Sequence, residues 1–377
     1  MRINLVFNDV PQLSETFLVS WMKLLLERGY SVQAIIMGKY FFGISEKQRF
    51  IPGIKYISKG NIAVFFKGVL FKKGFESLKS CLKANFISIG DPQLVHFSYS
   101  AIGVTYIDEI SLLRKKGIKF VVSCRGTSDN IKPYIELGRK EHLEHLFEQI
   151  DLVHCVSQEM LNRMVRDFGL KEEKGFVNRP AIDIVKFGFR TAKTPTDKTI
   201  VISTGRLEYV KGFVFALLGI KQLVQHGIDV EYRIVGGGKD EEYLRFLIQR
   251  LGLENHVCLL GPLSPEKVGL ELLQADIYLS SSLSEGISNA VLEAMAIGLP
   301  VVSTNVGGMS EVIETEITGL LVEPYEPDQI VRAIKRFVDE PDMRDGCIKN
   351  ARERIETEYN FERLIQVFDE SYESLLH

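Results

Sequence analysis

Short apolar runs alternate with amphipathic segments along nearly the whole chain. Runs of strand length in the first half are Ile3–Phe7, Val32–Met37, Leu94–Ser98, Phe120–Cys124, Leu152–Val156 and Gly175–Asn178. Those in the second half are Thr199–Thr204, Glu231–Val235, Val257–Leu260, Ile277–Ser281, Val301–Thr304 and Gly319–Val322. Most segments between them carry apolar residues at helical spacing. This alternation predicts an α/β fold with two doubly wound, Rossmann-like parallel sheets, each covered by helices on both faces.

The chain length also favours two domains, because 377 residues exceed what one compact core usually organises. The polar stretch from Thr191 to Lys198, which contains Pro195, separates two strand-like runs and is the expected boundary. We therefore expect a first domain over residues 1–190 and a second that begins at residue 191. Ligands of such sheets bind at the carboxyl ends of the strands.

Composition and charge refine this picture. The chain is 45% hydrophobic and 25% charged, as in soluble globular proteins. Residues 1–190 hold 28 basic and 19 acidic residues, and the remainder holds 18 basic and 30 acidic residues. Two domains with different partners would explain this asymmetry, and so would drift in surface composition. We find no motif of a nucleic-acid-binding module and expect no nucleic-acid partner.

The five cysteines include no C-x-x-C pair, which favours reduced thiols and a cytoplasmic protein. The first apolar run is too short for a signal peptide, and no run is long enough to span a bilayer. The segment Lys39–Lys83 has ten basic residues, two acidic residues and nine aromatic residues. It fits either a helix on an anionic membrane surface or a basic helix packed on the sheet by its apolar face.

Residues 280–311 carry the clearest chemical pattern, with the sequence SSSLSEGISNAVLEAMAIGLPVVSTNVGGMSE. A strand ends in serines, a polar turn follows, and Ser288 is an expected N-cap of a helix over Asn289–Ile297. The free N–H groups at a helix N-terminus bind anions such as a diphosphate. Gly286 permits close approach of the backbone to a ligand.

Two glutamates of this stretch are candidate functional residues. Glu293 lies just over one turn into the helix, from where its carboxylate could bind a pair of sugar hydroxyls. Glu285 lies in the turn and could stabilise positive charge at a reacting carbon. The alternative is a pair of surface carboxylates. The apolar neighbours of Glu293 and the lack of a nearby basic partner in the sequence argue against it.

This segment resembles the E-x7-E region of the family 4 glycosyltransferases, which have the GT-B architecture. Gly205-Arg206-Leu207 with Lys211-Gly212 resembles the first glycine-containing turn of that family, and residues 234–238 resemble its second. Residues 257–261 resemble the next strand. The resemblance covers nearly all of residues 199–325, with the motifs in the same order.

The resemblance implies roles for individual residues. Arg206 and Lys211 would neutralise the diphosphate of a nucleotide-sugar donor and, together with Glu285, form the catalytic group. The donor-binding residues would be Gly236, Gly261, Leu263, Gly286, Ile287, Ser288, Asn289 and Glu293. Glu293 would bind the ribose, and Gly261 and Leu263 would face the base.

The resemblance further implies a retaining, metal-independent reaction with no cofactor beyond the donor as co-substrate. Two domains would face each other across a cleft, with the donor domain spanning residues 191–358. The last helix, within residues 359–377, would pack back on the first domain.

The acceptor side is expected in the first domain. Ser14-Glu15-Thr16-Phe17 resembles an S-E-T-F segment of family members that assemble bacterial exopolysaccharide and lipopolysaccharide. Simple N-capping by Ser14 is an equal alternative. Arg125 stands where many relatives have a histidine and could bind an acidic acceptor or the donor phosphate. We assign Ser14, Glu15, Thr16 and Arg125 to the acceptor, a glycan that is lipid-linked or polymeric.

The sequence therefore predicts a retaining glycosyltransferase of cell-surface polysaccharide synthesis, cytoplasmic or peripheral on the inner face of the membrane. Two alternatives stay open. A sugar-nucleotide epimerase shares the two-domain architecture and would act without an acceptor. A non-catalytic nucleotide-sugar-binding subunit would bind the donor and turn nothing over.

Overall fold

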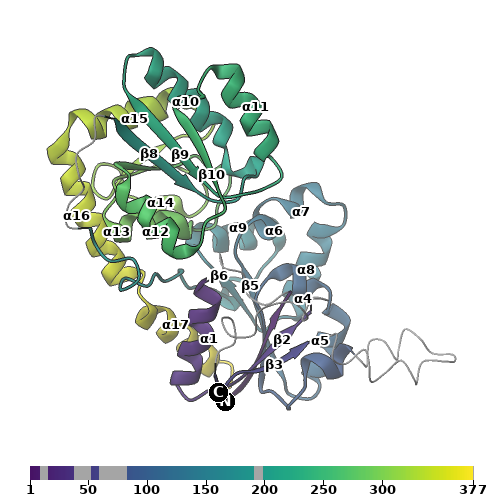
Figure 1. The fold of residues 1–377 in the computed structure, drawn as a ribbon. Helices are drawn as coiled ribbons and strands as arrows, with labels where there is room; N and C mark the ends of the chain where they lie inside the picture. The colour runs from purple at the N-terminus through teal and green to yellow at the C-terminus, as the bar shows by residue number, and fades with distance from the viewer. Residues whose placement is uncertain (9–15, 38–51, 59–82, 191–197, 377) are drawn as a thin grey trace. The chain divides into compact units, whose positions relative to one another are not determined.

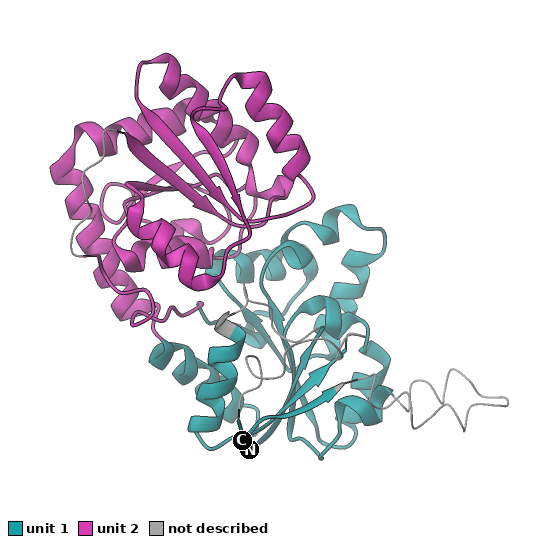
Figure 2. Ribbon diagram, in the orientation of Figure 1, with its two compact units in different colours: residues 1–179, 361–377 teal, residues 180–360 magenta. Residues whose placement is uncertain are grey.

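A computed structural model describes residues 1–8, 16–37, 52–58, 83–190 and 198–376. The chain forms two compact units, shown in Figure 2. Unit 1 comprises Met1–Arg179 and Phe361–His377, and unit 2 comprises Pro180–Asn360. Among the described residues, no helix is both long and apolar enough to cross a membrane.

Unit 1 is built on a parallel sheet with the strand order β3-β2-β1-β4-β5-β6-β7 (Figure 1). Its described strands are β1 (Arg2–Phe7), β2 (Ser31–Ile36), β3 (Lys55–Ser58), β4 (Leu94–Phe97), β5 (Lys119–Cys124), β6 (Leu152–Cys155) and β7 (Gly175–Val177). The sequence prediction missed β3, which pairs with β2 at the sheet edge. Only two of its four residues, Tyr56 and Ile57, favour a strand, so its apolar signal is weak.

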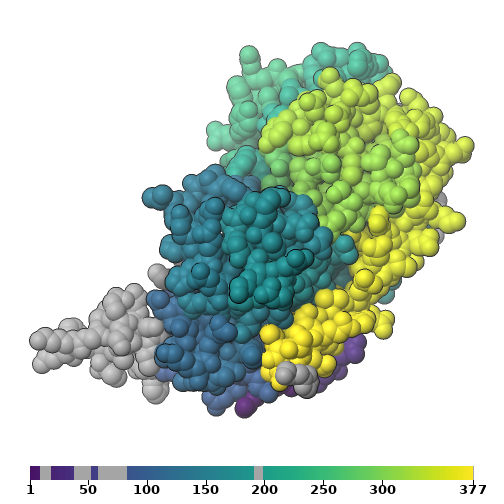
Figure 3. All heavy atoms as spheres, turned by 180° about the vertical axis from the view of Figure 1, so that it is seen from behind, coloured from purple at the N-terminus to yellow at the C-terminus, as the bar shows by residue number. Residues whose placement is uncertain are grey.

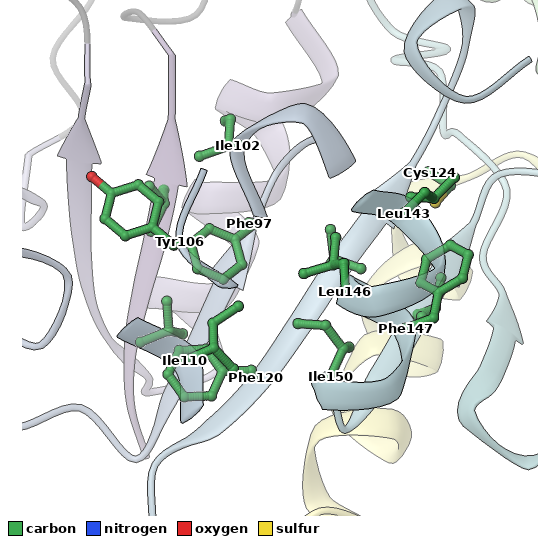
Figure 4. Close-up of a cluster of buried hydrophobic side chains, with 14 of the residues drawn as sticks. Phe97, Ile102, Tyr106, Ile110, Phe120, Cys124, Leu143, Leu146, Phe147 and Ile150 are labelled. Carbon is green, nitrogen blue, oxygen red and sulfur yellow. The ribbon is translucent and has the colours of Figure 1, made fainter. Parts of the chain in front are cut away.

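The helices of unit 1 follow the strands in the expected alternation. They are α1 (Thr16–Glu27), α4 (Ser100–Val104), α5 (Ile107–Arg114), α6 (Thr127–Asn130), α7 (Lys132–Ile135), α8 (Arg139–Gln149), α9 (Gln158–Phe168) and α17 (Phe361–Glu373). One face of the sheet packs its alternate residues, such as Phe97 and Phe120, against α4, α5 and α8. Figure 4 shows this cluster, in which Leu146 of α8 and Ile150, the residue after α8, approach the strands.

The opposite face of this sheet is covered by α1 and α17, which contact each other. Trp21 of α1 stacks on Phe368 of α17 with ring centroids 4.9 Å apart. Helix α17 lies at the surface of unit 1, where it is yellow in Figure 3. The last helix of the chain therefore packs, by its buried face, on the unit that contains the N-terminus.

Unit 2 is built on a second parallel sheet with the order β10-β9-β8-β11-β12-β13. Its strands are β8 (Thr199–Thr204), β9 (Val230–Val235), β10 (Val257–Gly261), β11 (Ile277–Ser280), β12 (Val301–Thr304) and β13 (Leu320–Val322). Its α-helices are α10 (Phe213–Gln225), α11 (Glu241–Leu251), α12 (Pro265–Gln274), α13 (Asn289–Ile297), α14 (Met309–Val312), α15 (Pro327–Asp339) and α16 (Pro341–Glu358). Helices α10, α11 and α15 cover one face, and α12, α13 and α16 cover the other. All six strands fall on runs predicted from the sequence.

The two units divide at Arg179, which is earlier than the boundary expected at residue 190. Residues 180–190 pack on unit 2, because Ile182 N–H donates to the Tyr359 carbonyl at 2.8 Å. The Arg190 guanidinium also donates to the Ala275 carbonyl at 2.7 Å. The polar stretch 191–197 lies outside the described residues. The chain returns to unit 1 at Phe361, close to the expected residue 359.

Candidate active site

The candidate site of unit 2 lies where the order of the strands reverses. Strand β8 is flanked by β9, which follows it in the chain, and by β11, which comes much later. Helices therefore leave neighbouring strands on opposite faces, and the carboxyl ends of β8 and β11 border a crevice. Ligands of open α/β sheets bind at such a point. The turn after β8 contains Gly205 and Lys211, and the loop after β11 contains Glu285.

Lys211 and Glu285 form an ion pair at this point, with Nζ and Oε1 2.5 Å apart. Their side chains are 21% and 12% exposed, so water screens the pair only partly. Ser282 Oγ donates a second hydrogen bond to the same Oε1 at 2.7 Å. Ser281 Oγ donates to the Lys211 carbonyl at 2.9 Å, which joins the turn after β8 to the loop after β11. The structure thus brings together two residues predicted to be catalytic.

Two glycines allow these loops to approach closely. A Cβ atom on Gly212 would lie 2.0 Å from the Ser281 carbonyl oxygen, and one on Gly307 would lie 2.0 Å from the Glu285 carbonyl oxygen. Both glycines also have positive φ angles, of 62° and 56°. Any side chain would therefore add both strain and a collision with the backbone that carries Glu285.

Helix α13 begins beside the ion pair, with the bounds predicted from the sequence. Ser288 occupies the N-cap position, but its hydroxyl makes no capping hydrogen bond. The N–H groups of Asn289 and Ala290 have no hydrogen-bond acceptor among the described residues. These groups and the buried Ser288 hydroxyl face the end of the helix where an anion would bind. The predicted N-cap position of Ser288 is confirmed, but its side chain makes no capping hydrogen bond, so the hydroxyl is left for another partner.

Glu293 is half-buried on the same helix. Burial raises the pKa of its carboxyl to about 7, and the more distant Lys186 opposes this increase. No described side chain donates a hydrogen bond to it. Tyr278 lies close by, since burial and then the charges of Glu293 and Glu285 raise the pKa of its phenol. A carboxyl in this environment gains from a ligand that donates hydrogen bonds to it.

The remaining predicted donor residues lie in or beside the turns that follow β8, β9, β10 and β11. Gly236 N–H donates to the Gly261 carbonyl at 2.9 Å, so these two turns touch. Ile287 and Leu263 pack against the apolar cluster on the α12–α13 face. Arg206 is 66% exposed and pairs with Glu208 at 3.3 Å, so the structure does not place it on the Lys211–Glu285 pair. Gly286 supplies the carbonyl that accepts from Gly308 N–H at 2.8 Å.

The predicted acceptor residues fall in unit 1. Ser14 and Glu15 lie outside the described residues, as does most of Lys39–Lys83, and Thr16 begins α1 with its side chain also outside them. Arg125 follows β5 and is half-buried. Its Nε donates to the Ser98 carbonyl at 3.2 Å, and its backbone N–H donates to Asp129 Oδ2 at 2.8 Å.

Ser282 and Tyr278 are two residues of the site that were not predicted from the sequence. Tyr278 is fully buried on β11, and its hydroxyl lies 3.1 Å from Thr204 Oγ1 at the end of β8. Ser282 belongs to the serine run after β11, and that run was the available signal. A cluster of hydroxyls at the carboxyl end of a buried strand indicates a polar site.

Comparisons with known proteins identify the class. The family described as glycosyl transferases group 1 matches residues 187–354. A Salmonella typhimurium protein named as the colanic acid biosynthesis glycosyltransferase WcaL is 26% identical over 96% of both chains. Its Escherichia coli counterpart is 30% identical over 72% of this chain and 67% of its own length. The chain belongs to this glycosyltransferase family.

Solved structures agree on the fold. Sucrose-phosphate synthase from Thermosynechococcus elongatus has a TM-score of 0.82 at 19% identity, covering 100% of this chain and 99% of its own. Anabaena HepE, solved in complex with UDP-glucose, has a TM-score of 0.79 at 18% identity, covering 99% and 100%. The prediction of the GT-B fold with two Rossmann-like domains is confirmed.

Proposed function

We propose that the protein is a retaining glycosyltransferase that moves a sugar from a nucleoside diphosphate to a glycan acceptor. The observation that carries the proposal is the Lys211–Glu285 pair. It lies beside the N-terminus of α13 at the point where the strand order of unit 2 reverses. A cation, a carboxylate and free backbone N–H groups at one point suit a diphosphate bonded to a sugar.

The donor is held by groups of complementary chemistry. Lys211 and the N–H groups at the start of α13 bind the diphosphate, and Glu293 accepts hydrogen bonds from the ribose. Gly236, Gly261 and Leu263 line the side that receives the base. Arg206 leaves Glu208 and binds the diphosphate. Breaking the Arg206–Glu208 ion pair costs little free energy, because the pair is exposed. HepE, which shares the fold, was solved with UDP-glucose, and this supports a donor of the same chemical class.

The reaction follows from charge. As the bond between the sugar and the phosphate breaks, negative charge builds on the leaving diphosphate, where Lys211 and the α13 N-terminus stabilise it. Glu285 stabilises the positive charge that develops on the sugar carbon. The acceptor hydroxyl attacks from the face that the diphosphate leaves, and a departing phosphate oxygen takes its proton, which retains the anomeric configuration. Neither a metal ion nor a resident cofactor is required in this scheme.

The acceptor is proposed to be a lipid-linked or polymeric glycan of bacterial exopolysaccharide synthesis. WcaL is named for colanic acid, and a 30% identical Erwinia amylovora relative, AmsK, is named for amylovoran. Arg125 binds an anionic group of this acceptor. The composition of Lys39–Lys83, most of which lies outside the described residues, supports contact with the cytoplasmic face of an anionic membrane.

A panel of nucleotide sugars tests the donor half. Calorimetry on the full chain should detect a diphosphate nucleotide sugar, and mass spectrometry with a glycan acceptor should detect the extended product. Failure of every nucleoside diphosphate sugar to bind would refute the proposal. Conversion of the donor to an isomer with no acceptor present would assign the protein to the epimerases instead.

A further inference from the structure

A buried chain of polar side chains crosses the sheet of unit 1 on the face covered by α1 and α17. It runs through Tyr372 of α17, His96 of β4, Ser123 of β5, His154 of β6 and the backbone carbonyl of Asn178. All four side chains are at most 1% exposed. The four heavy-atom distances along the chain are 2.7, 2.8, 2.8 and 2.8 Å. We call this set the buried hydrogen-bond chain.

The direction of the hydrogen bonds can be worked out from the carbonyl end. The Asn178 carbonyl only accepts, so His154 Nε2 carries a proton and donates to it. Burial and the charge of Arg125 lower the pKa of His154 well below its usual value, so the ring is neutral. Its Nδ1 is then an acceptor, and the Ser123 hydroxyl must donate to it.

The remaining bonds follow from the capacity of one hydroxyl. Ser123 Oγ has two lone pairs, which accept from Arg125 Nη2 at 3.2 Å and from His96 Nε2 at 2.8 Å. Burial, His154 and Arg125 lower the pKa of His96, so its Nδ1 accepts from the Tyr372 hydroxyl. With His154 neutral, the single proton of the Ser123 hydroxyl is used on His154 Nδ1, so His96 Nε2 must be the donor to Ser123 Oγ. With both imidazoles neutral, as their lowered pKa values require, the arrangement is satisfied only when both are Nε2–H tautomers.

Among the described residues, the buried hydrogen-bond chain contacts the charged side chain of Arg125 and holds it in place. The guanidinium of Arg125 donates from Nε to the Ser98 carbonyl and from Nη2 to Ser123 Oγ. Two hydrogen bonds, one to the residue that follows β4 and one to β5, set both the position and the plane of the guanidinium. Ser123 is in turn held by the two histidines on its neighbouring strands.

We propose that Ser123 is a positioning residue, which the two neutral histidines orient so that the guanidinium of Arg125 meets an anionic group of the acceptor. A phosphate or a carboxylate matches this planar donor. The inference rests on the proposed function, because it assumes that Arg125 contacts the acceptor. The same chain anchors the segments where the polypeptide leaves and re-enters unit 1. The side chain of Asn178 donates to the Leu364 carbonyl of α17 at 2.9 Å.

The hydrogen-bond directions can be tested without any activity measurement. Two-bond ¹H–¹⁵N correlation spectra of the ¹⁵N-histidine-labelled full chain report the tautomer and charge of each imidazole. At pH 7 we expect His96 and His154 to be neutral and in the Nε2–H form. An Nδ1–H tautomer or an imidazolium at either position would overturn the inference. Tyr372→Phe deletes one hydroxyl and keeps the ring, so it should shift the His96 Nδ1 signal and identify it.

Kinetics test the positioning role. Ser123→Ala should raise the acceptor KM about tenfold and leave the donor KM unchanged, because a hydrogen bond to a charged group is lost only on the acceptor side. In an Arg125→Ala background, Ser123→Ala should add nothing further. Effects that multiply in the double variant, or an unchanged acceptor KM in Ser123→Ala, would overturn the inference.

Ser157→Ala is the matched control. Ser157 is an equally buried serine of unit 1 that caps α9 by accepting from Met160 N–H at 3.1 Å. Its loss should lower the melting temperature and leave the acceptor KM unchanged. If Ser123→Ala does not fold, Tyr372→Phe takes its place, with an expected rise of about threefold in the acceptor KM. A wild-type protein that transfers no sugar would refute the proposed function. The spectra would still decide the donor and acceptor directions along the buried hydrogen-bond chain.

Discussion

The polar centres of the two units lie on similar parallel sheets but differ in chemical state. In unit 2, Lys211 and Glu285 form a partly exposed ion pair, and Glu293 has a carboxyl pKa raised to about 7 by burial. In unit 1, His96 and His154 are fully buried, neutral and bonded at both ring nitrogens. The first centre has groups that a ligand can engage, and the second is complete without one. The same fold thus supports two kinds of polar centre, depending on the side chains that the strands and the loops after them carry. Lys211, Glu285 and Glu293 form a site that responds to a ligand, which we call the responsive site. The buried histidines of unit 1 belong to a rigid structural anchor.

Removal of the cation from the responsive site should give the largest effect. Lys211→Ala deletes the charge that stabilises the leaving diphosphate, so turnover should fall about 10²–10³-fold. Lys349→Ala is the control, because Lys349 is an exposed lysine on α16 of the same unit. Steady-state rates and melting curves of both variants measure the difference. Wild-type turnover in Lys211→Ala would contradict the assignment of this residue.

Acidification should affect the two units in opposite directions. The folded pKa values of His96 and His154 are lowered below the usual 6.5, so below pH 6.5 the unfolded state binds protons that the folded state does not. The stability of unit 1 should therefore fall below pH 6.5, by up to about 2.7 kcal/mol per pH unit for two protons. Burial raises the pKa of Glu293 from 4.5 to about 7, so between these values the folded state binds a proton that the unfolded state does not. The free energy of unfolding of unit 2 should therefore rise as the pH falls from 7 to 4.5.

Hydrogen exchange followed by mass spectrometry measures this contrast, since it reports β4–β6 and α13 separately. Exchange at pH 5 and pH 7, corrected for the intrinsic rate, should show protection lost in β4–β6 and kept in α13. His142→Ala removes an exposed histidine of α8 and should leave the pattern unchanged. Equal loss of protection in β4–β6 and in α13 on acidification would contradict the proposed difference in chemical state between the two units.

A smaller effect is expected when Gly307, which packs against the backbone carbonyl of Glu285, is replaced by alanine. Gly307→Ala places Cβ where the Glu285 carbonyl lies 2.0 Å away and also strains a positive φ, so it should cost about 2 kcal/mol and lower turnover. Gly227→Ala is matched in φ, at 77°, but its Cβ meets no atom within 4 Å. It should cost about 1 kcal/mol and leave turnover unchanged. Chemical denaturation measures the free energy of unfolding of both variants. Equal losses would mean that the close contact at Gly307 is unimportant.

Much of the fold was predictable because most strands are continuous apolar runs, and β3 was missed because its signal is weak. The donor site was predictable in part, since Glu285, Ser288 and Glu293 lie within one stretch of the chain. Lys211 lies 74 residues before Glu285, and only the resemblance to a family joined the two. The individual pairing of Lys211 with Glu285, and the exposure of Arg206, required the structure.

The buried hydrogen-bond chain could not be predicted from the sequence. His96 and His154 each look like ordinary residues of a strand, and Tyr372 lies 276 residues from His96. Their contact depends on the order of the strands in the sheet and on the return of α17 to unit 1. Neither follows from local periodicity, because hydrophobic patterns define elements but not which elements are neighbours.

The pH dependence of donor binding tests the responsive site most finely. Glu293 must be ionised to accept hydrogen bonds from two ribose hydroxyls, and in the free protein its pKa is about 7. Bound hydroxyls stabilise the carboxylate and lower this pKa, so below pH 7 binding must release a proton. The donor Kd should therefore be constant above about pH 8 and rise up to about tenfold per pH unit below 7.

Calorimetry in buffers of different ionisation enthalpy would count the proton that is released. Glu293→Gln should bind the donor more weakly at pH 8 but with little dependence on pH, because an amide does not titrate. Glu353→Gln, at an exposed position of α16, should retain the wild-type profile. A pH profile that persists in Glu293→Gln would place the titrating group elsewhere. Glu293 would then be a neutral structural group of unit 2, comparable to the buried histidines of unit 1.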